Sequence, residues 1–286
     1  MRVSESELST EFAVDRPDTT LAAQRSGAGA GVLLLHGLSA TRRYVLHGST
    51  AIERAGYQVV SYDARGHGDS TPANHPETYD YDTLGEDAVA VLDRAGIDRA
   101  ILIGQSMGAA TAVNVALRHP ERVAGLVVVT PAHLGAPSNR LERWDRLARG
   151  LREAGVEGFM EAYGDPPVPE RWRDTIKTVI RQRLSRHVHP AAVADALSAT
   201  PRSAAFDGMD ELTGIAVPTL IVASLDELDP DHPLRIAEQY VRTIPNAEFL
   251  IENPGESPLA WRGGSLSAGV LRFLADSGLG PADSEH

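Results

Sequence analysis

The chain has 286 residues and a formal net charge of -12, and it is 42% hydrophobic and 23% charged. This is the composition of an ordinary globular protein, long enough to bury a sizeable core without cross-links. The acidic balance disfavours binding to nucleic acid and to anionic membranes, and the apolar runs are too short to span a bilayer. Because there is no cysteine, disulfides, thiolate metal sites and cysteine nucleophiles are excluded.

The first residues, Met1 to Glu7, are polar and acidic and lack the apolar segment of a signal peptide. We therefore expect a cytoplasmic protein whose partner is a small molecule.

Strands and helices alternate through residues 1–134. Short, β-branched apolar runs without polar alternation are typical of strands buried on both faces. Four such runs predict strands, and three helices are expected between them: strands at 32–36, 58–63, 100–105 and 125–130, and helices at 40–55, 83–95 and 107–119. This alternation with short connections predicts an α/β fold with a mostly parallel, doubly wound sheet.

The alternation stops after Pro131. Residues 135–205 contain no strand candidate and predict a helical insertion, with helices at 141–154, 171–185 and 190–199. The sheet is expected to resume within 206–277, with strands at 218–224 and 247–252 and helices at 233–244 and 265–275. Residues 278–286 are predicted to be a disordered tail.

The segment Gly104-Gln105-Ser106-Met107-Gly108 matches the pattern G-x-S-x-G. It follows an apolar strand and precedes a helix rich in small residues, which is the context of a nucleophile elbow. The two glycines leave room for strand, turn and helix to approach closely. Ser106 is therefore the predicted nucleophile, presented at the carboxyl edge of the sheet.

These features resemble the α/β-hydrolase superfamily, in its esterase, lipase and carbon–carbon hydrolase branch with a helical cap. The resemblance rests on His36-Gly37, on the elbow and on the segment from Tyr62 to Ser70, and it covers roughly residues 32–274. It implies that the insertion is a cap and that backbone N–H groups of Leu38 and Met107 form an oxyanion hole. His36 is expected to orient its loop, and Arg65, His67 and Asp69 are expected to be structural.

The acid that the resemblance implies should follow the strand at 218–224. The segment there, from Ser224 to Pro233, is unusually acidic and about two residues longer than the family pattern. Counting from the strand places the acid at Asp226 or Glu227, whereas counting back from Pro233 places it at Asp229. We take Asp226 as the expected acid and keep Asp229 as the alternative.

The histidine that the resemblance implies is missing from its usual turn, where the sequence has Glu256. A serine needs a neighbouring base to become a useful nucleophile. Three hypotheses remain open: Glu256 acts with a raised pKa, another histidine such as His133 or His232 is recruited, or hydrolysis is lost.

The larger apolar side chains near the expected site are candidates for binding substrate, although each is also explained by packing: Trp261, Trp144, Phe159 and Trp172. No phosphate-binding loop or metal-ligand spacing is recognised, so no cofactor and no metal are expected. We expect a cofactor-free serine hydrolase acting on an ester, thioester or activated carbonyl of a small apolar molecule. The alternative is a non-hydrolytic protein of the same fold, either a binding protein or a cyclase or lyase.

Overall fold

The computed structural model describes residues 9–225, 229, 231–254, 261 and 263–281. Their strands form one eight-stranded sheet in the order β1-β2-β4-β3-β5-β6-β7-β8. The six strands from β4 to β8 along this order are parallel, and their bounds are Gln58–Tyr62 (β4), Gly31–Leu35 (β3), Ala100–Gln105 (β5), Val123–Val129 (β6), Thr219–Ala223 (β7) and Glu248–Ile251 (β8). The predicted α/β sheet is therefore confirmed.

An antiparallel hairpin extends the sheet beyond β4. It consists of β1 (Ser9–Asp15) and β2 (Thr20–Ser26), and β2 pairs antiparallel with β4. The sequence analysis did not predict these strands, because their mixed polar and apolar residues lack the continuous apolar runs of the central strands.

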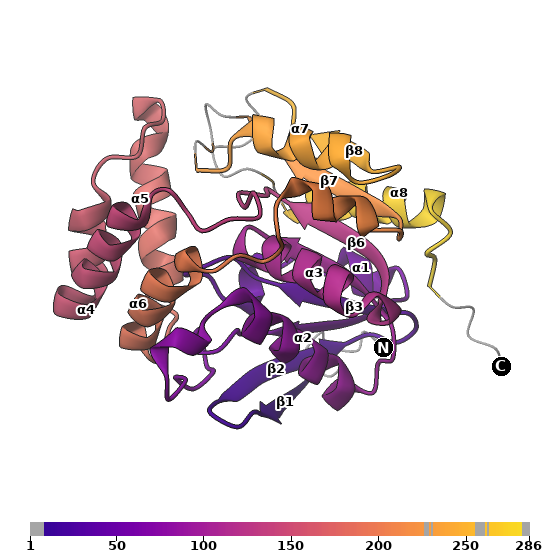
Figure 1. The fold of residues 1–286 in the computed structure, drawn as a ribbon, viewed down its shortest axis with the longest axis horizontal. Helices are drawn as coiled ribbons and strands as arrows, with labels where there is room; N and C mark the ends of the chain where they lie inside the picture. Colours follow the sequence, from indigo (N-terminus) through magenta and orange to yellow (C-terminus); the bar gives the residue numbers. More distant parts are fainter. Residues whose placement is uncertain (1–8, 226–228, 230, 255–260, 262, 282–286) are drawn as a thin grey trace, which may run out of the picture.

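Helices cover both faces of the sheet (Figure 1). Successive residues of a strand point to opposite faces, and β3 shows this directly: Leu33 and Leu35 belong to one core cluster, whereas Val32 and Leu34 belong to the other. Helices α2 (Tyr81–Ala95), α3 (Met107–Arg118) and α7 (Leu234–Thr243) pack into the first cluster, and α1 (Ala51–Arg54) and α8 (Gly263–Asp276) pack into the second.

Three further helices lie together to one side of the sheet in Figure 1, and we call them the α4–α6 unit. They are α4 (Leu141–Tyr163), α5 (Glu170–Leu184) and α6 (Pro190–Ala199), and they enclose an apolar cluster of their own. They fall within the predicted insertion 135–205. Helix α4 runs nine residues beyond the predicted end at Ala154 because the chain bends at Ala154 and Gly155 and then resumes helical geometry.

Two other predictions were inaccurate. The helix expected at 40–55 is reduced to a single turn of 3-10 helix at Arg42–Tyr44 and the short α1, separated by His47 and Gly48 at positive φ. The tail predicted from residue 278 is packed at its start, where the Tyr57 hydroxyl donates to the carbonyl of Leu279 at 3.0 Å. Residues 282–286 lie outside the described residues.

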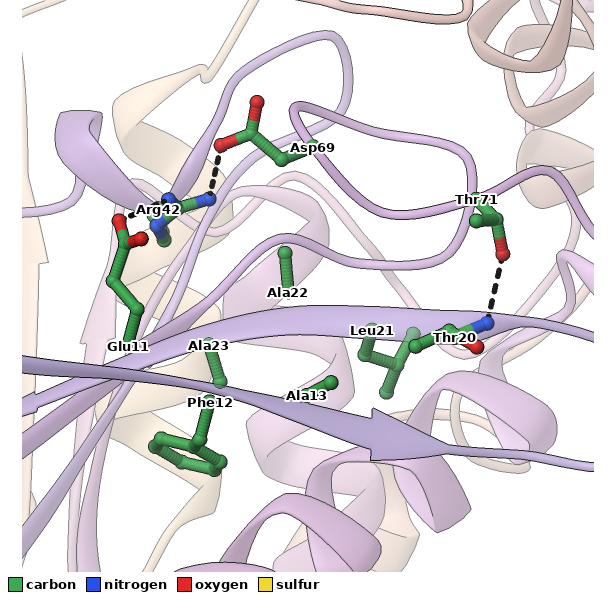
Figure 2. Close-up of a pocket in the computed structure, with 10 residues that line it drawn as sticks. All are labelled: Glu11, Phe12, Ala13, Thr20, Leu21, Ala22, Ala23, Arg42, Asp69 and Thr71. Atoms are coloured by element: carbon green, nitrogen blue, oxygen red, sulfur yellow. Dashed lines mark hydrogen bonds and ion pairs between the residues drawn. The ribbon is translucent and has the colours of Figure 1, made fainter.

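The described helices include none that is both long and apolar enough to cross a membrane. A cavity of about 430 Å³ lies beside the β1–β2 hairpin. Figure 2 shows Arg42 at one end of it, between Glu11 and Asp69, and the contact of Thr20 with Thr71 at the other. None of its lining residues belongs to the elbow or to the predicted acid loop.

Candidate active site

Ser106 lies on a strained turn between β5 and α3. Its backbone has φ 53° and ψ -110°, a conformation that costs free energy for a residue with a side chain. Two backbone bonds hold it: Ser106 N–H donates to Val129 O at 3.0 Å, and Ala110 N–H donates to Ser106 O at 3.1 Å. The turn therefore presents the serine side chain beyond the carboxyl end of β5.

The flanking glycines are required by the closeness of the backbone around this turn. A Cβ on Gly104 would lie 2.1 Å from the carbonyl oxygen of Gly108, and a Cβ on Gly108 would lie 2.1 Å from that of Leu35. Both distances are far below any tolerable contact. The strand–turn–helix geometry inferred from the motif is thus present, and it depends on two positions without side chains.

His232 lies within hydrogen-bond distance of Ser106. Its Nε2 is 2.8 Å from Ser106 Oγ, and its Nδ1 is 2.8 Å from Asp229 Oδ1. Because a carboxylate only accepts, Nδ1–H donates to Asp229 and leaves Nε2 to accept the serine O–H. Ser106, His232 and Asp229 therefore form a continuous serine–imidazole–carboxylate chain.

The imidazole and the carboxylate come from one loop, which follows β7 and leads into α7. They are three residues apart, and His232 N–H donates to Asp229 O at 3.0 Å, closing a turn between them. At the start of the loop, Asp229 N–H donates to Leu225 O at 3.1 Å, and Leu225 N–H donates to the buried Glu252 at 3.1 Å. The loop is thereby tied to the end of β8.

Two arginines at the start of α4, the N-cap Arg140 and Arg143 of the first turn, hold the same loop from the other side. Asp231, next to His232, forms ion pairs with Arg140 at 3.2 Å and with Arg143 at 3.0 Å. Burial lowers the pKa of His232, but the charge and hydrogen bond of Asp229, together with the charge of Asp231, outweigh burial and raise it above its usual value. The acidic neighbours thus stabilise the imidazolium that forms when His232 takes a proton.

The loop after β3 approaches Ser106 from the neighbouring strand. A Cβ on Gly37 would lie 3.5 Å from Ser106 Cβ, so the residues that follow Gly37 stand beside the elbow. Within the described part of the chain, the N–H of Leu38 has no hydrogen-bond partner. Met107 is the first residue of α3, a position at which helices leave the N–H without an intrahelical acceptor.

Buried histidines hold this loop in place. His36 Nδ1–H donates to Gly37 O at 2.8 Å, and its Nε2 accepts from Ala64 N–H at 2.9 Å. Burial lowers the pKa of His36 to about 4, so it is neutral near pH 7. His187, from the connection between α5 and α6, donates to Ser39 O at 3.1 Å and accepts from Gly68 N–H at 2.8 Å.

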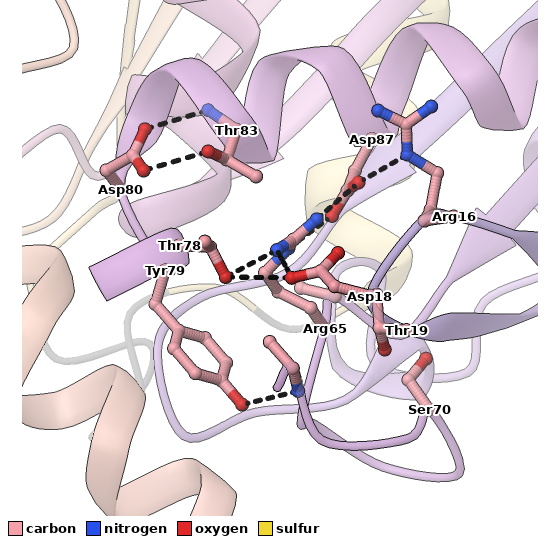
Figure 3. A network of polar contacts seen from close by, with 12 residues as sticks. Arg16, Asp18, Thr19, Arg65, Ser70, Thr78, Tyr79, Asp80, Thr83 and Asp87 are labelled. Atoms are coloured by element: carbon pink, nitrogen blue, oxygen red, sulfur yellow. Dashed lines mark hydrogen bonds and ion pairs between the residues drawn. The ribbon is translucent and has the colours of Figure 1, made fainter. Parts of the chain in front are cut away.

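The loop from Arg65 to Ser70 is structural in its contacts, as the resemblance implies. Arg65 is 1% exposed and forms a two-point contact with Asp87, with distances of 2.8 and 2.9 Å, and a further bond to Asp18 at 3.0 Å (Figure 3). This buried network ties the loop to α2 and to the β1–β2 hairpin, away from Ser106.

The remaining predicted residues have other positions. Asp226, the expected acid, and Glu256, the expected base, lie outside the described residues. His133 Nε2 accepts from Ala205 N–H at 3.0 Å, and its ring packs against Tyr81 and Phe206, so its acceptor nitrogen is engaged there.

The four aromatic candidates lie within packed clusters. Phe159 is 4% exposed in the cluster of the α4–α6 unit, against which Trp144 and Trp172 also pack. Trp261 is 8% exposed in the core beneath the sheet, and its indole N–H donates to Ala223 O at 3.1 Å. Packing accounts for these contacts, and binding of substrate by these residues stays a prediction.

A comparison with protein families matches residues 32–262 to the α/β hydrolase fold family. The chain belongs to this family. It is 26% identical over 228 residues to a putative carbamate hydrolase of Caulobacter segnis, covering 76% of this chain and 81% of that protein. It is 28% identical over 203 residues to 3-oxoadipate enol-lactonase 2 of Acinetobacter baylyi, covering 71% of this chain and 69% of that protein.

Among solved structures, the fold is similar to that of a thermophilic esterase from Thermogutta terrifontis. The TM-score is 0.75 and the sequence identity is 24%, and the match covers 94% of this chain and 99% of the esterase. At this identity the likeness concerns the fold.

Proposed function

We propose that the protein is a cofactor-free serine hydrolase that cleaves an ester, thioester or similarly activated carbonyl bond of a small molecule. The observation that carries this proposal is the 2.8 Å distance between His232 Nε2 and Ser106 Oγ, with Asp229 at 2.8 Å from Nδ1. A base within this distance of a serine hydroxyl is the requirement for nucleophilic catalysis. The similarity to a carbamate hydrolase and an enol-lactonase supports the same reaction class.

In the first half of the reaction, Ser106 Oγ attacks the substrate carbonyl while its proton passes to His232 Nε2. Asp229 accepts the Nδ1–H bond and stabilises the imidazolium that forms. The oxyanion of the tetrahedral intermediate accepts bonds from the N–H groups of Leu38 and Met107. When the intermediate collapses, His232 returns the proton to the leaving group and an acyl-serine remains.

In the second half, a water molecule gives a proton to His232 Nε2 and attacks the acyl carbonyl. The second tetrahedral intermediate releases the acid and restores the Ser106 hydroxyl with the proton held by His232. This sequence needs a base whose protonated form is stabilised beside the serine, and the charges of Asp229 and Asp231, which raise the pKa of His232 against the effect of burial, supply that stabilisation.

The non-hydrolytic alternative was motivated by the absence of a histidine after the last strand. His232 supplies an imidazole from the loop between β7 and α7, so the missing histidine no longer favours the non-hydrolytic alternative. Glu256 is not needed as a base in the proposed mechanism.

Labelling with a fluorophosphonate probe tests the proposal directly. We expect an adduct on the peptide that contains Ser106, and we expect no adduct in the matched variant Ser106→Ala. Turnover of a series of p-nitrophenyl esters should likewise disappear in that variant. A folded wild-type protein that gives neither an adduct nor turnover would contradict the proposed function.

A further inference from the structure

Arg183 combines a position beside the loop after β3 with a guanidinium that is only partly bonded. It lies in the last turn of α5, where its Nη2 is 3.5 Å from Ser39 Oγ and its Nε is buried without a hydrogen-bond partner. In the part of the chain that the structure describes, no carboxylate lies within ion-pair distance of it. Five other arginines of this region each pair with a carboxylate: Arg140, Arg143, Arg152, Arg181 and Arg202.

The guanidinium of Arg183 lies beside the candidate active site. Ser39, its one partner, follows Leu38, whose N–H we assign to the oxyanion hole. Burial lowers the pKa of Arg183, and the charge of Asp229 opposes this shift, while the charge of Arg183 works against the raised pKa of His232, so the guanidinium is close enough to both groups to interact with them. The guanidinium therefore lies against the loop after β3 that carries Leu38 and Ser39, within electrostatic reach of the loop that carries Asp229 and His232.

Arg183 is half-buried, and its Nε, buried without a hydrogen-bond partner, is costly at this place unless a further acceptor completes its bonding. An arginine remains protonated in proteins, so it cannot relieve the cost by losing its proton. Asp229 accepts the Nδ1–H bond of His232 and forms no ion pair with Arg183. The contact with Ser39, at 3.5 Å, uses one of the five N–H donors of the guanidinium. Among the described residues, no other acceptor forms a hydrogen bond with the remaining donors, so they can bind a ligand.

The planar donor fork of arginine matches the two oxygens of a carboxylate, which it binds more strongly than it binds neutral acceptors. We propose that Arg183 binds a carboxylate carried by the substrate, so that the preferred substrates are esters or lactones whose acyl part bears a second, ionised acid group. This inference rests on the proposed function and narrows it. It replaces the expectation of a wholly apolar substrate.

Two esters of similar length test the inference: mono-4-nitrophenyl glutarate, which carries a carboxylate, and 4-nitrophenyl pentanoate, which does not. We expect wild-type kcat/KM to be at least about 10-fold higher for the glutarate ester. In Arg183→Gln, the ratio of the two kcat/KM values should fall about 30-fold, because a charge-assisted contact is lost only for the anionic ester.

Arg186→Gln is the matched control. Arg186 is exposed and lies just after α5, and its side chain, unlike that of Arg183, forms no hydrogen bond with Ser39, so this variant should keep the wild-type ratio. Arg183→Lys retains a positive charge without the donor fork and should give an intermediate ratio. Thermal melting of each variant establishes that it is folded.

Equal losses on both esters in Arg183→Gln would overturn the inference, as would a wild-type ratio near one. Calorimetric titration with glutarate separates this failure from failure of the proposed function. If neither ester is hydrolysed but the wild type binds glutarate and Arg183→Gln does not, the carboxylate site stands and the hydrolase proposal falls. If the esters are hydrolysed and glutarate binds the wild type and Arg183→Gln equally, the carboxylate site falls.

Discussion

The elbow at Ser106 and the loop that carries His232, the proposed base, differ in what holds them in place. The elbow is determined by backbone contacts: Gly104 and Gly108 admit no Cβ, and the strained Ser106 is bonded to β6 and α3. The proposed base loop, between β7 and α7, is held by side chains from two other parts of the chain: Glu252 at the end of β8, and Arg140 and Arg143 at the start of α4, which bind Asp231.

This difference has a consequence for function. A turn defined by sterics has one geometry or fails to fold, whereas a loop held by polar contacts can be adjusted without unfolding the domain. Substitutions in the elbow should therefore change stability, and substitutions in the base loop should change rate or pH dependence. The predictions below test this division, beginning with the largest effect.

Asp229→Asn should reduce kcat by about 10³- to 10⁴-fold with little change in melting temperature, because an amide no longer holds the imidazole in the tautomer that accepts the serine proton. Asp226→Asn is the matched control in the same loop and should keep kcat within a few-fold of wild type. Steady-state kinetics on the best p-nitrophenyl ester provides the measurement. A larger loss in Asp226→Asn than in Asp229→Asn would assign the acid to Asp226.

Gly108→Ala should destabilise the fold by about 3 kcal/mol or more, since the new Cβ would meet the Leu35 carbonyl, which cannot move without displacing β3. Gly264→Ala, in α8, is the control: nothing lies within 4 Å of its Cβ position, so a helix-favouring alanine should be neutral or mildly stabilising. Urea unfolding measures both. Comparable stability of the two variants would contradict the steric account of the elbow.

The loop after β3, which we propose carries an oxyanion donor, should lose stability in acid. His36 has its pKa lowered to about 4 in the folded protein, against an ordinary value of 6.5, so the unfolded chain binds the proton more readily. The contribution of neutral His36 to the free energy of unfolding is complete above pH 6.5. It is lost as the pH falls through about 4, which lowers the free energy of unfolding by about 3 kcal/mol in total. The unfolding free energy of His36→Gln, measured from pH 7 to pH 4, should therefore fall less steeply than that of wild type; equal slopes would contradict this role.

Asp231→Asn should shift the pH dependence of activity without abolishing it. The charge of Asp231 contributes to the raised pKa of His232, so its removal should lower that pKa and extend activity to lower pH. Because Asp231 also faces two arginines and is partly exposed, we expect a shift of less than about one pH unit. The acidic limb of the kcat/KM profile provides the readout, and a limb that moves to higher pH would contradict this assignment.

Much of the fold could be predicted from the sequence, because parallel strands buried on both faces have continuous apolar runs. The elbow was predictable for a related reason: its glycines and serine are adjacent in sequence and act through local geometry. The hairpin of β1 and β2 was missed since its alternating residues carry a weaker signal, and the kink at Ala154 and Gly155 concealed the second half of α4.

The proposed base, His232, could be named from the sequence only as one alternative among several. His232 and Asp229 are neighbours in sequence, but the sequence does not show that their loop turns toward Ser106. That path depends on Glu252 and on Arg140 and Arg143, which are 20 or more residues away along the chain. The extra length of the acidic segment before Pro233 was the available signal, and it is the spacing that allows both groups to come from one loop.

The kcat values of His232→Gln and Glu256→Gln, measured side by side on the same ester, test the central claim most directly. If His232 is the base that activates Ser106, His232→Gln should lose at least about 10³-fold in kcat, while Glu256→Gln should remain within a few-fold of wild type. A loss of that size in Glu256→Gln, with His232→Gln nearly as active as wild type, would contradict the account.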